Sequence, residues 1–244
     1  MNLNFSNCTY KIVDNGDTAI TVIFDEQISE QLTLKIMQLS EHLKIKFDTN
    51  IIDVIPAYQS LTISYHSNNN MQKQISKTIA SLLKKKLQPL NYSAKTIEIP
   101  VCYEPAFAPD LEAVSKHTGL AIKDIIALHS KVEYLVHMLG FLPGFLYLGG
   151  LNSQLSCPRK KSPNINIHAG SVGIGGDQTG VYPINSPGGW NIIGRTPVKL
   201  FMPNKSQPFL ANPLDKVKFI PISPEQYQIL SSEINEVGFS DEVS

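Results

Sequence analysis

Residues 168–183 read HAGSVGIGGDQTGVYP, and glycines separate the short runs of β-type residues within them. This stretch lies in a longer region, between Gly140 and Gly194, that holds twelve of the chain's fifteen glycines, interleaved with prolines. Repeated glycines and prolines between short strands predict a compact β-barrel or sandwich with long shaped loops. Residues 172–174 and 191–193 are the predicted strands nearest these turns.

The sequence on either side of this region completes a predicted second domain, residues 94–237. Further strands are expected at residues 96–103 and as short pieces within 197–221. Two short helices, residues 109–117 and 121–130, precede the glycine-rich region, and residues 224–237 predict a closing helix.

The first ninety residues show cleaner periodicity and predict a separate small domain, residues 1–90. Residues 9–13 and 18–24 alternate as strands around an Asn15-Gly16 turn. Ser29 is the expected N-cap of an amphipathic helix. Two more strands follow at residues 51–55 and 61–65, and a polar loop at 67–70 leads to a second amphipathic helix that carries Ile75, Ile79, Leu82 and Leu83. Residues 89–93 are the expected linker. The order ββα-ββα predicts a two-layer α/β domain with helices over one sheet face.

Composition and sequence pattern argue against several classes of protein. Lys plus Arg and Asp plus Glu both number 21, which argues against a nucleic-acid-binding surface. Residues 1–4 begin no basic-then-apolar leader, and no apolar run approaches the length of a membrane span. The scattered Cys8, Cys102 and Cys157 predict neither a disulfide framework nor a metal site. These features favour a cytoplasmic protein that binds no membrane.

The glycine-rich stretch itself is a candidate ligand site. Backbone N–H groups exposed at glycines can form an anion-binding concavity without a helix. The candidate residues, with polar side chains at the rim, are Gly173, Gly175, Gly176, Asp177, Gln178 and Thr179. A purely structural turn is the alternative for the same residues.

Two arginines are further candidates for binding anions. Arg195 lies in the string SPGGWNIIGRTP, residues 186–197, and Arg159 lies in CPRKK, residues 157–161. A guanidinium group is planar and matches the two oxygens of a carboxylate or phosphate. A surface ion pair is the alternative for either side chain.

Residues 139–151, LGFLPGFLYLGGL, are too rich in glycine and proline for a regular helix. Phe141, Phe145 and Tyr147 are candidates for lining a groove that holds a ligand or partner, and the sole tryptophan, Trp190, joins them. A buried turn that packs aromatic rings is the alternative.

Other types of site are not predicted. Gln178 stands where a dinucleotide fingerprint needs a small residue, and no Walker-type string occurs. Ser171 lacks the nucleophile-elbow pattern. His129 and His137 are eight residues apart and have no carboxylate cluster around them, so no metal site is expected. The sequence assigns no catalytic side chain.

Three strings together, GFLPGFLYLGGL, AGSVGIGGDQTGVYP and SPGGWNIIGRTP, resemble the family formed by the B subunits of 5-oxoprolinase. It is also called allophanate hydrolase subunit 1 or the sporulation-kinase inhibitor (KipI-like) family. The resemblance implies an α+β fold in which a cyclophilin-like β-barrel follows the N-terminal α/β domain.

The same resemblance implies ATP-driven hydrolysis of 5-oxo-L-proline to L-glutamate, carried out with the A and C subunits of the 5-oxoprolinase complex. ATP, with Mg²⁺, is the implied cofactor, and the glycines, Arg195 and Arg159 are the residues expected to meet its phosphates or the lactam. The chain by itself is expected to be inactive.

Two other functions remain open from the sequence. Members of the family resemble a non-catalytic inhibitor that binds a sensor histidine kinase, in which case the aromatic residues would form the partner surface. The second function is that of a subunit of another amide hydrolase, acting on urea or allophanate. A stand-alone prolyl isomerase is the least favoured, because a shared barrel is not a shared site.

Overall fold

A computed structural model describes residues 9–67, 70–85, 87 and 92–240 of the chain; the side chains of residues 235–240 are not described. The chain divides into two compact units, Met1–Ser93 and Ala94–Ser244. Part of the predicted linker, residues 88–91, lies outside the described residues. Each unit has its own buried apolar cluster.

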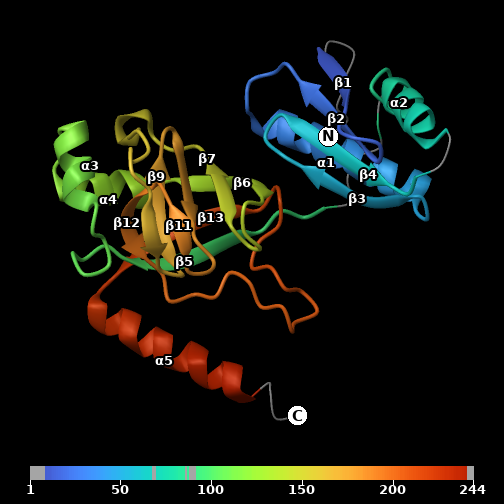
Figure 1. Ribbon diagram of the computed structural model, residues 1–244. Coiled ribbons are helices and arrows are strands. Elements are labelled where there is room, and N and C mark those ends of the chain that lie inside the picture. Colours follow the sequence, from blue (N-terminus) through green and yellow to red (C-terminus); the bar gives the residue numbers. More distant parts are fainter. Residues whose placement is uncertain (1–8, 68–69, 86, 88–91, 241–244) are drawn as a thin grey trace. The chain divides into compact units, whose positions relative to one another are not determined.

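The N-terminal unit is a four-stranded antiparallel sheet with two helices packed on it (Figure 1). The strand order is β1-β2-β4-β3, and the elements follow the predicted ββα-ββα sequence. Their bounds are β1 Tyr10–Asp14, β2 Ala19–Phe24, α1 Glu30–Phe47, β3 Ile51–Pro56, β4 Ser60–Tyr65 and α2 Met71–Leu82.

Local sequence signals account for the ends of these elements. Gly16 takes a φ of 75° in the turn between β1 and β2, a conformation that costs glycine little. The Ser29 side chain accepts a hydrogen bond from the backbone N–H of Leu32 at 3.2 Å, so the predicted N-cap is confirmed.

One apolar layer holds the sheet and the helices together. Alternate residues of β2 and β4 are buried, and they meet the apolar stripe of α1. The central members of this cluster are Ile20, Val22, Leu32, Ile36, Leu39, Leu61 and Ile63. The period of two along the strands and of about 3.6 along the helix confirms the predicted two-layer arrangement.

The C-terminal unit is built on a closed barrel of seven strands, in the order β10-β7-β6-β13-β5-β12-β9. The strands are β5 Thr96–Cys102, β6 Glu133–Leu139, β7 Leu146–Gly149, β9 Ser171–Gly175, β10 Gln178–Val181, β12 Asn191–Arg195 and β13 Lys216–Ile222. Only β5 and β13 run parallel among the described strand pairs of this barrel. The fold class, an α+β chain with an N-terminal α/β unit and a barrel, is confirmed.

Shorter elements surround the barrel (Figure 1). A two-stranded sheet pairs β8 with β11, and helices α3 and α4 lie beside each other. The bounds are α3 Leu111–Thr118, α4 Ile122–Ser130, η1 Ser153–Leu155, β8 Asn164–Ile167, β11 Ser186–Gly188 and α5 Pro224–Ser240. The predicted helices near residues 109–117, 121–130 and 224–237 are confirmed.

The expectation of several short strands within residues 197–221 is wrong for most of that segment. In the described chain only β13 and an isolated bridge between Phe201 and Phe209 form there. The cause is the proline content, because a proline at each of 197, 203, 208 and 213 removes an N–H that a strand ladder would need.

Among the described residues, no helix combines the length and the apolar composition needed to cross a membrane.

Candidate functional site

The predicted glycine-rich site is the β9–β10 hairpin of the barrel. Gly176, with a φ of 66°, and Asp177 form its two-residue turn, the position where glycine favours a tight hairpin. The Gly176 N–H donates to the carbonyl oxygen of Cys157 at 2.7 Å. Gly173 and Gly175 lie inside the paired strands. The hairpin therefore does not form the predicted concavity of free N–H groups.

The glycines of this hairpin make room for an aromatic ring. A Cβ added to Gly175 would lie 2.6 Å from Cδ1 of Trp190. One added to Gly180 would lie 3.1 Å from Cζ3 of the same ring, and one at Gly173 would lie 3.2 Å from its Cβ. A side chain at Gly175 or Gly180 would push against the indole ring, and one at Gly173 would press on the Cβ of Trp190. The alternative that the glycine-rich stretch is purely structural thus explains why glycine stands at positions 173 and 175, where it leaves room for close packing.

The polar residues of the hairpin have different environments. Asp177 is exposed, and its carboxylate accepts a hydrogen bond from the Ser156 hydroxyl at 2.6 Å. Gln178 is partly exposed at the start of β10. Thr179 is fully buried, so its hydroxyl cannot meet a ligand without opening the barrel. A binding role for Asp177 and Gln178 stays a prediction.

Trp190 is the centre of a compact group of aromatic side chains, the Trp190 cluster, at one side of the barrel. Its ring contacts Phe145 at 5.5 Å, Tyr147 at 6.3 Å and Tyr182 at 6.4 Å between centroids. All three pairs are edge-to-face, the geometry that aromatic quadrupoles favour. Phe145 and Trp190 are buried, so these two groove candidates pack the interior, while Tyr147 is half-buried.

Phe141, the fourth groove candidate, is placed differently. It is 64% exposed and has a φ of 65°, which is unusual for a bulky residue. It borders a shallow apolar hollow of about 230 Å³ between the loop that joins β6 to β7 and Phe209. Its ring meets Phe145 edge-to-face at 5.8 Å, so one end of this loop reaches the Trp190 cluster.

Arg159 lies on the Trp190 cluster. Its guanidinium carbon is 5.7 Å from the centroid of the Trp190 ring, a cation–π contact. Its charge also reaches the neighbouring phenols: burial raises the pKa of Tyr147, and the positive charge of Arg159 opposes that shift. The structure therefore brings together three of the predicted site residues, Arg159, Trp190 and Tyr147.

Arg195 is at the other end of β12, and it does not converge with Arg159. Its guanidinium carbon lies 5.9 Å from the ring centroid of Phe107. Within the described residues its buried Nε has no hydrogen-bond partner. Burial raises the pKa of Tyr227 in α5, and the charge of Arg195 opposes this rise. The extended chain from position 190 to position 195 spans roughly 16 Å, so Arg195 lies away from Arg159.

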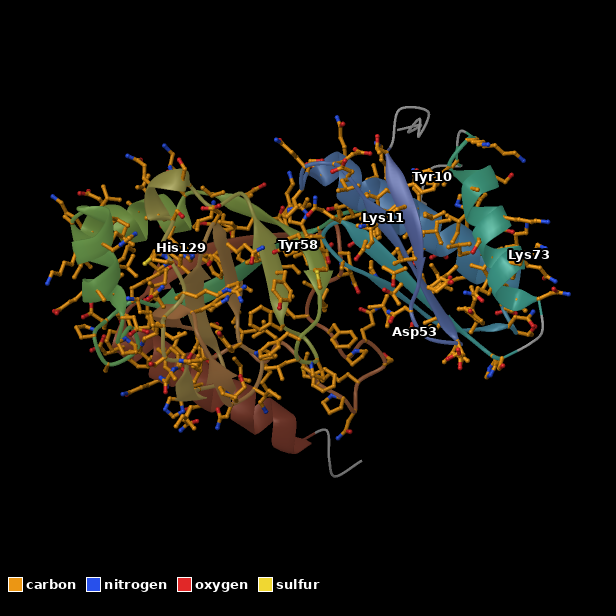
Figure 2. All side chains as sticks on the ribbon, turned by 45° about the horizontal axis from the view of Figure 1, so that its top comes forward. Tyr10, Lys11, Asp53, Tyr58, Lys73 and His129 are labelled. Atoms are coloured by element: carbon orange, nitrogen blue, oxygen red, sulfur yellow. The ribbon has the colours of Figure 1, made fainter. Side chains whose placement is uncertain are left out.

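His129, which Figure 2 labels among the side chains of the C-terminal unit, is the centre of a buried chain of polar groups that no local sequence pattern signals. The His129 Nδ1 is 2.8 Å from the Tyr103 hydroxyl, and its Nε2 is 2.9 Å from the Thr179 hydroxyl. The Thr179 hydroxyl donates its only hydrogen to the Gly173 carbonyl at 3.0 Å, so it must accept from Nε2–H. In a neutral ring the proton therefore lies on Nε2, and the Tyr103 hydroxyl donates to Nδ1.

Burial explains why this histidine stays neutral. Its side chain is fully buried, and desolvation lowers the pKa of His129 from 6.5 to about 3. The ring also stacks on Phe219 at 4.7 Å. Both ring nitrogens are occupied within the core, so His129 stabilises the barrel and is not placed to exchange protons with a ligand.

Metal-binding side chains do not gather in the described part of the chain: no group of three or more His, Cys, Asp or Glu residues there has the spacing to hold an ion.

Comparisons with known proteins agree on one family. A family model described as the carboxyltransferase domain, subdomain C and D, matches residues 10–211. The chain is 39% identical over 236 residues to the B subunit of 5-oxoprolinase from Bacillus subtilis strain 168, covering 93% of this chain and 98% of that protein. It is 38% identical over 206 residues to the corresponding 5-oxoprolinase B subunit of Escherichia coli O157:H7, covering 84% and 93%.

A solved structure with the same fold comes from a longer protein. The crystal structure of TTHA0988 matches with a TM-score of 0.73 at 34% identity, over 84% of this chain. This chain spans only 40% of the TTHA0988 chain, so that relative carries a large additional part.

Proposed function

The chain belongs to the carboxyltransferase-domain subdomain C and D family, and we propose that it is one subunit of an ATP-dependent 5-oxoprolinase. The predicted resemblance to the B subunits of 5-oxoprolinase is confirmed by the family match over residues 10–211 together with the 39% and 38% identities to two such subunits. The proposed complex hydrolyses 5-oxo-L-proline to L-glutamate with consumption of ATP, and the partners are the A and C subunits of that complex.

The observation that carries this proposal is the near full-length similarity to a relative of the same size. The 39% identity to the Bacillus subtilis protein extends over 98% of that protein, so both units of the chain are included. The additional part of TTHA0988 supports a role beside other domains or subunits, because a related segment there is one part of a larger chain.

The chemistry explains why such a complex would need several parts. A five-membered lactam is a resonance-stabilised amide that water attacks slowly. Transfer of a phosphoryl group to the lactam oxygen would remove that resonance and provide a good leaving group. The protein must then hold the nucleotide, the lactam and water in register and neutralise phosphate charge.

The geometry of this chain favours a role in binding a ligand of the complex over a role in supplying a catalytic nucleophile. His129 is neutral and enclosed, and the thiols of Cys102 and Cys157 are buried, with burial raising the pKa of each thiol. Arg159 and Arg195 are the positively charged candidates near aromatic rings. This supports the expectation that the chain alone is inactive.

ATP and Mg²⁺ belong to the proposal, but the hairpin does not fit the phosphates as expected. The N–H of Gly176 is engaged by Cys157, and the Thr179 hydroxyl is enclosed in the core. No nucleotide contact is therefore assigned to Gly173, Gly175, Gly176 or Thr179. Asp177, Gln178, Arg159 and Arg195 stay candidates for contacts with a ligand of the complex.

Reconstitution tests the proposal. The chain is purified alone and together with the A and C subunits from the same genome, and 5-oxoproline-dependent release of ADP is measured. Turnover is expected only when all subunits are present. Complexes that omit this chain, and complexes supplied with urea or allophanate, are the matched controls.

Two outcomes would contradict the proposal. ADP release with urea or allophanate but not with 5-oxoproline would assign the chain to another amide hydrolase. Absence of turnover in every combination, together with tight binding of a purified sensor histidine kinase, would favour the inhibitor function.

A further inference from the structure

The segment that carries Arg159 is fixed to the barrel on both sides of that residue. Before it, Cys157 pairs with Gly176, and the Asn191 amide donates to the Pro158 carbonyl at 3.0 Å. After it, the Lys160 N–H donates to the Gly189 carbonyl at 2.7 Å. Arg159 is therefore held in place by its neighbours rather than by its own side chain.

An ion pair beside Arg159 neutralises the adjacent lysine, Lys160. Lys160 Nζ lies 2.5 Å from Oδ1 of Asp110, and the other oxygen of Asp110 accepts from the Ile192 N–H at 2.8 Å. The Asp110 carboxylate is thus fully used between Lys160 and the backbone of β12. Among the described residues, Arg159 makes no ion pair or hydrogen bond of its own.

The contact with Trp190 leaves the donors of Arg159 available. A cation–π contact involves no hydrogen-bond acceptor, so the N–H groups in the plane of the guanidinium can still donate in pairs to a ligand. The side chain is exposed, while the indole beneath it is only 4% exposed. The planar set of guanidinium N–H donors, called the fork below, is therefore held next to a buried indole ring.

We propose that Arg159, lying on Trp190, is the subsite that binds the carboxylate of a small cyclic amino-acid substrate. A planar carboxylate matches the fork with two parallel hydrogen bonds, and the half-buried Tyr147 offers apolar ring surface beside it for a small ring. A triphosphate would need several converging positive charges, and the pairing of Lys160 with Asp110 leaves this segment only Arg159 and the exposed Lys161. The identity of the substrate as 5-oxoproline rests on the proposed function.

Trp190 is the chain's only tryptophan and provides the readout. Indole emission responds to a change of charge next to the ring, so a carboxylate on Arg159 alters the fluorescence of the intact chain. Titration with 5-oxoproline is expected to give a saturable change. The lactam 2-pyrrolidinone, which lacks the carboxylate, is expected to give none, and ATP is the phosphate probe.

Matched variants distinguish the effect of the paired guanidinium donors on ligand affinity from the effect of positive charge alone. Arg159→Gln is expected to weaken 5-oxoproline binding roughly tenfold to a hundredfold, the loss of a charge-assisted pair. Arg159→Lys keeps the charge but not the fork, so it restores only part of the affinity. Lys161→Gln removes a charge from the same exposed segment and leaves the affinity unchanged. Circular dichroism checks that each variant is folded.

Kinetics of the reconstituted complex give the second measurement. Arg159→Gln is expected to raise the KM for 5-oxoproline at least about tenfold, with kcat largely retained, because an interaction of the ground state is lost. An unchanged KM in an active complex would overturn the subsite and leave the proposed function standing. A fluorescence change caused by ATP, or equally by 2-pyrrolidinone, would also overturn it.

Failure of the proposed function can be distinguished from failure of the carboxylate subsite. If the complex does not turn over 5-oxoproline but proline or another cyclic carboxylate still alters Trp190 emission through Arg159, the proposed function fails while the carboxylate subsite is supported. No emission change with any carboxylate, in an isolated chain that is folded, and no KM effect in the complex would exclude the subsite.

Discussion

The two units of this chain build their cores in different ways. The N-terminal unit buries a regular apolar layer that follows the strand and helix periodicities, and the buried polar side chains described in it, Thr33, Gln38 and Ser40, all lie on α1. The barrel unit encloses specific polar and small groups among its apolar residues, including His129, Thr179 and the glycines beside Trp190. A core that depends mainly on the spacing of apolar residues tolerates exchange of one apolar side chain for another. A core that depends on specific packing contacts and hydrogen bonds does not. The candidate ligand residues, Arg159, Tyr147 and Trp190, belong to the barrel unit, whose core is of the second type.

The largest effect is expected from acidification of the barrel. His129 has a pKa of about 3 in the folded chain and an ordinary value of 6.5, so its neutral form is favoured by folding. Below pH 6.5 the unfolded chain binds a proton that the folded chain excludes. The free energy of unfolding therefore falls as the pH falls, by up to about 1.4 kcal/mol per pH unit until the folded pKa is reached.

Urea unfolding of the wild type and of His129→Gln between pH 7 and pH 4.5 measures this contribution. The variant is expected to be about 2 kcal/mol less stable at pH 7, because the Tyr103 and Thr179 hydroxyls lose a well-placed partner. It should also lose the part of the pH slope that belongs to His129. Parallel pH profiles for the two proteins would show that this histidine is not buried in its neutral form.

Gly175→Val tests the fit around Trp190. The new side chain would press on an indole that lies 2.6 Å from the position of its Cβ, so a loss of about 3 kcal/mol in unfolding free energy is expected. Gly189→Ala is the matched control, since the nearest heavy atom would be 3.7 Å away. Equal stability of the two variants in thermal unfolding would contradict the packing role of Gly175.

The smallest effect is expected in the N-terminal unit. Ser29→Ala removes the side-chain acceptor of the Leu32 N–H and should cost about 1 kcal/mol. Ser29→Asn keeps an acceptor at the same position and should preserve stability. Urea midpoints of the two variants compare them directly, and a loss well above that of Gly175→Val would reverse the comparison between the units.

The features that sequence predicted well are those fixed by neighbours along the chain. The Asn15-Gly16 turn, the Ser29 cap and the stripe of α1 depend on residues within one or two turns of each other. The barrel was also predictable, because its glycines and prolines punctuate the strands. The irregular course of residues 197–215 is not predictable from the same signal, because a proline is compatible both with the end of a strand and with a segment in which no strand ladder forms.

The candidate site was less predictable because its parts are distant in the sequence. Thr179 contacts His129 across 50 positions, and no local pattern marks that pair. A glycine string is compatible both with free N–H groups and with a ring packed on the strand, and only Trp190 decides between them. Likewise, sequence grouped Arg159 with Arg195, but the course of β12 separates them.

Formation of glutamate is the most direct test of the central claim that this chain works within a 5-oxoprolinase complex. Glutamate and ADP are measured together, for the A and C subunits with and without this chain. Equal amounts of glutamate and ADP only in the presence of the chain are the predicted result. The same rate of glutamate formation when the chain is omitted would contradict the claim.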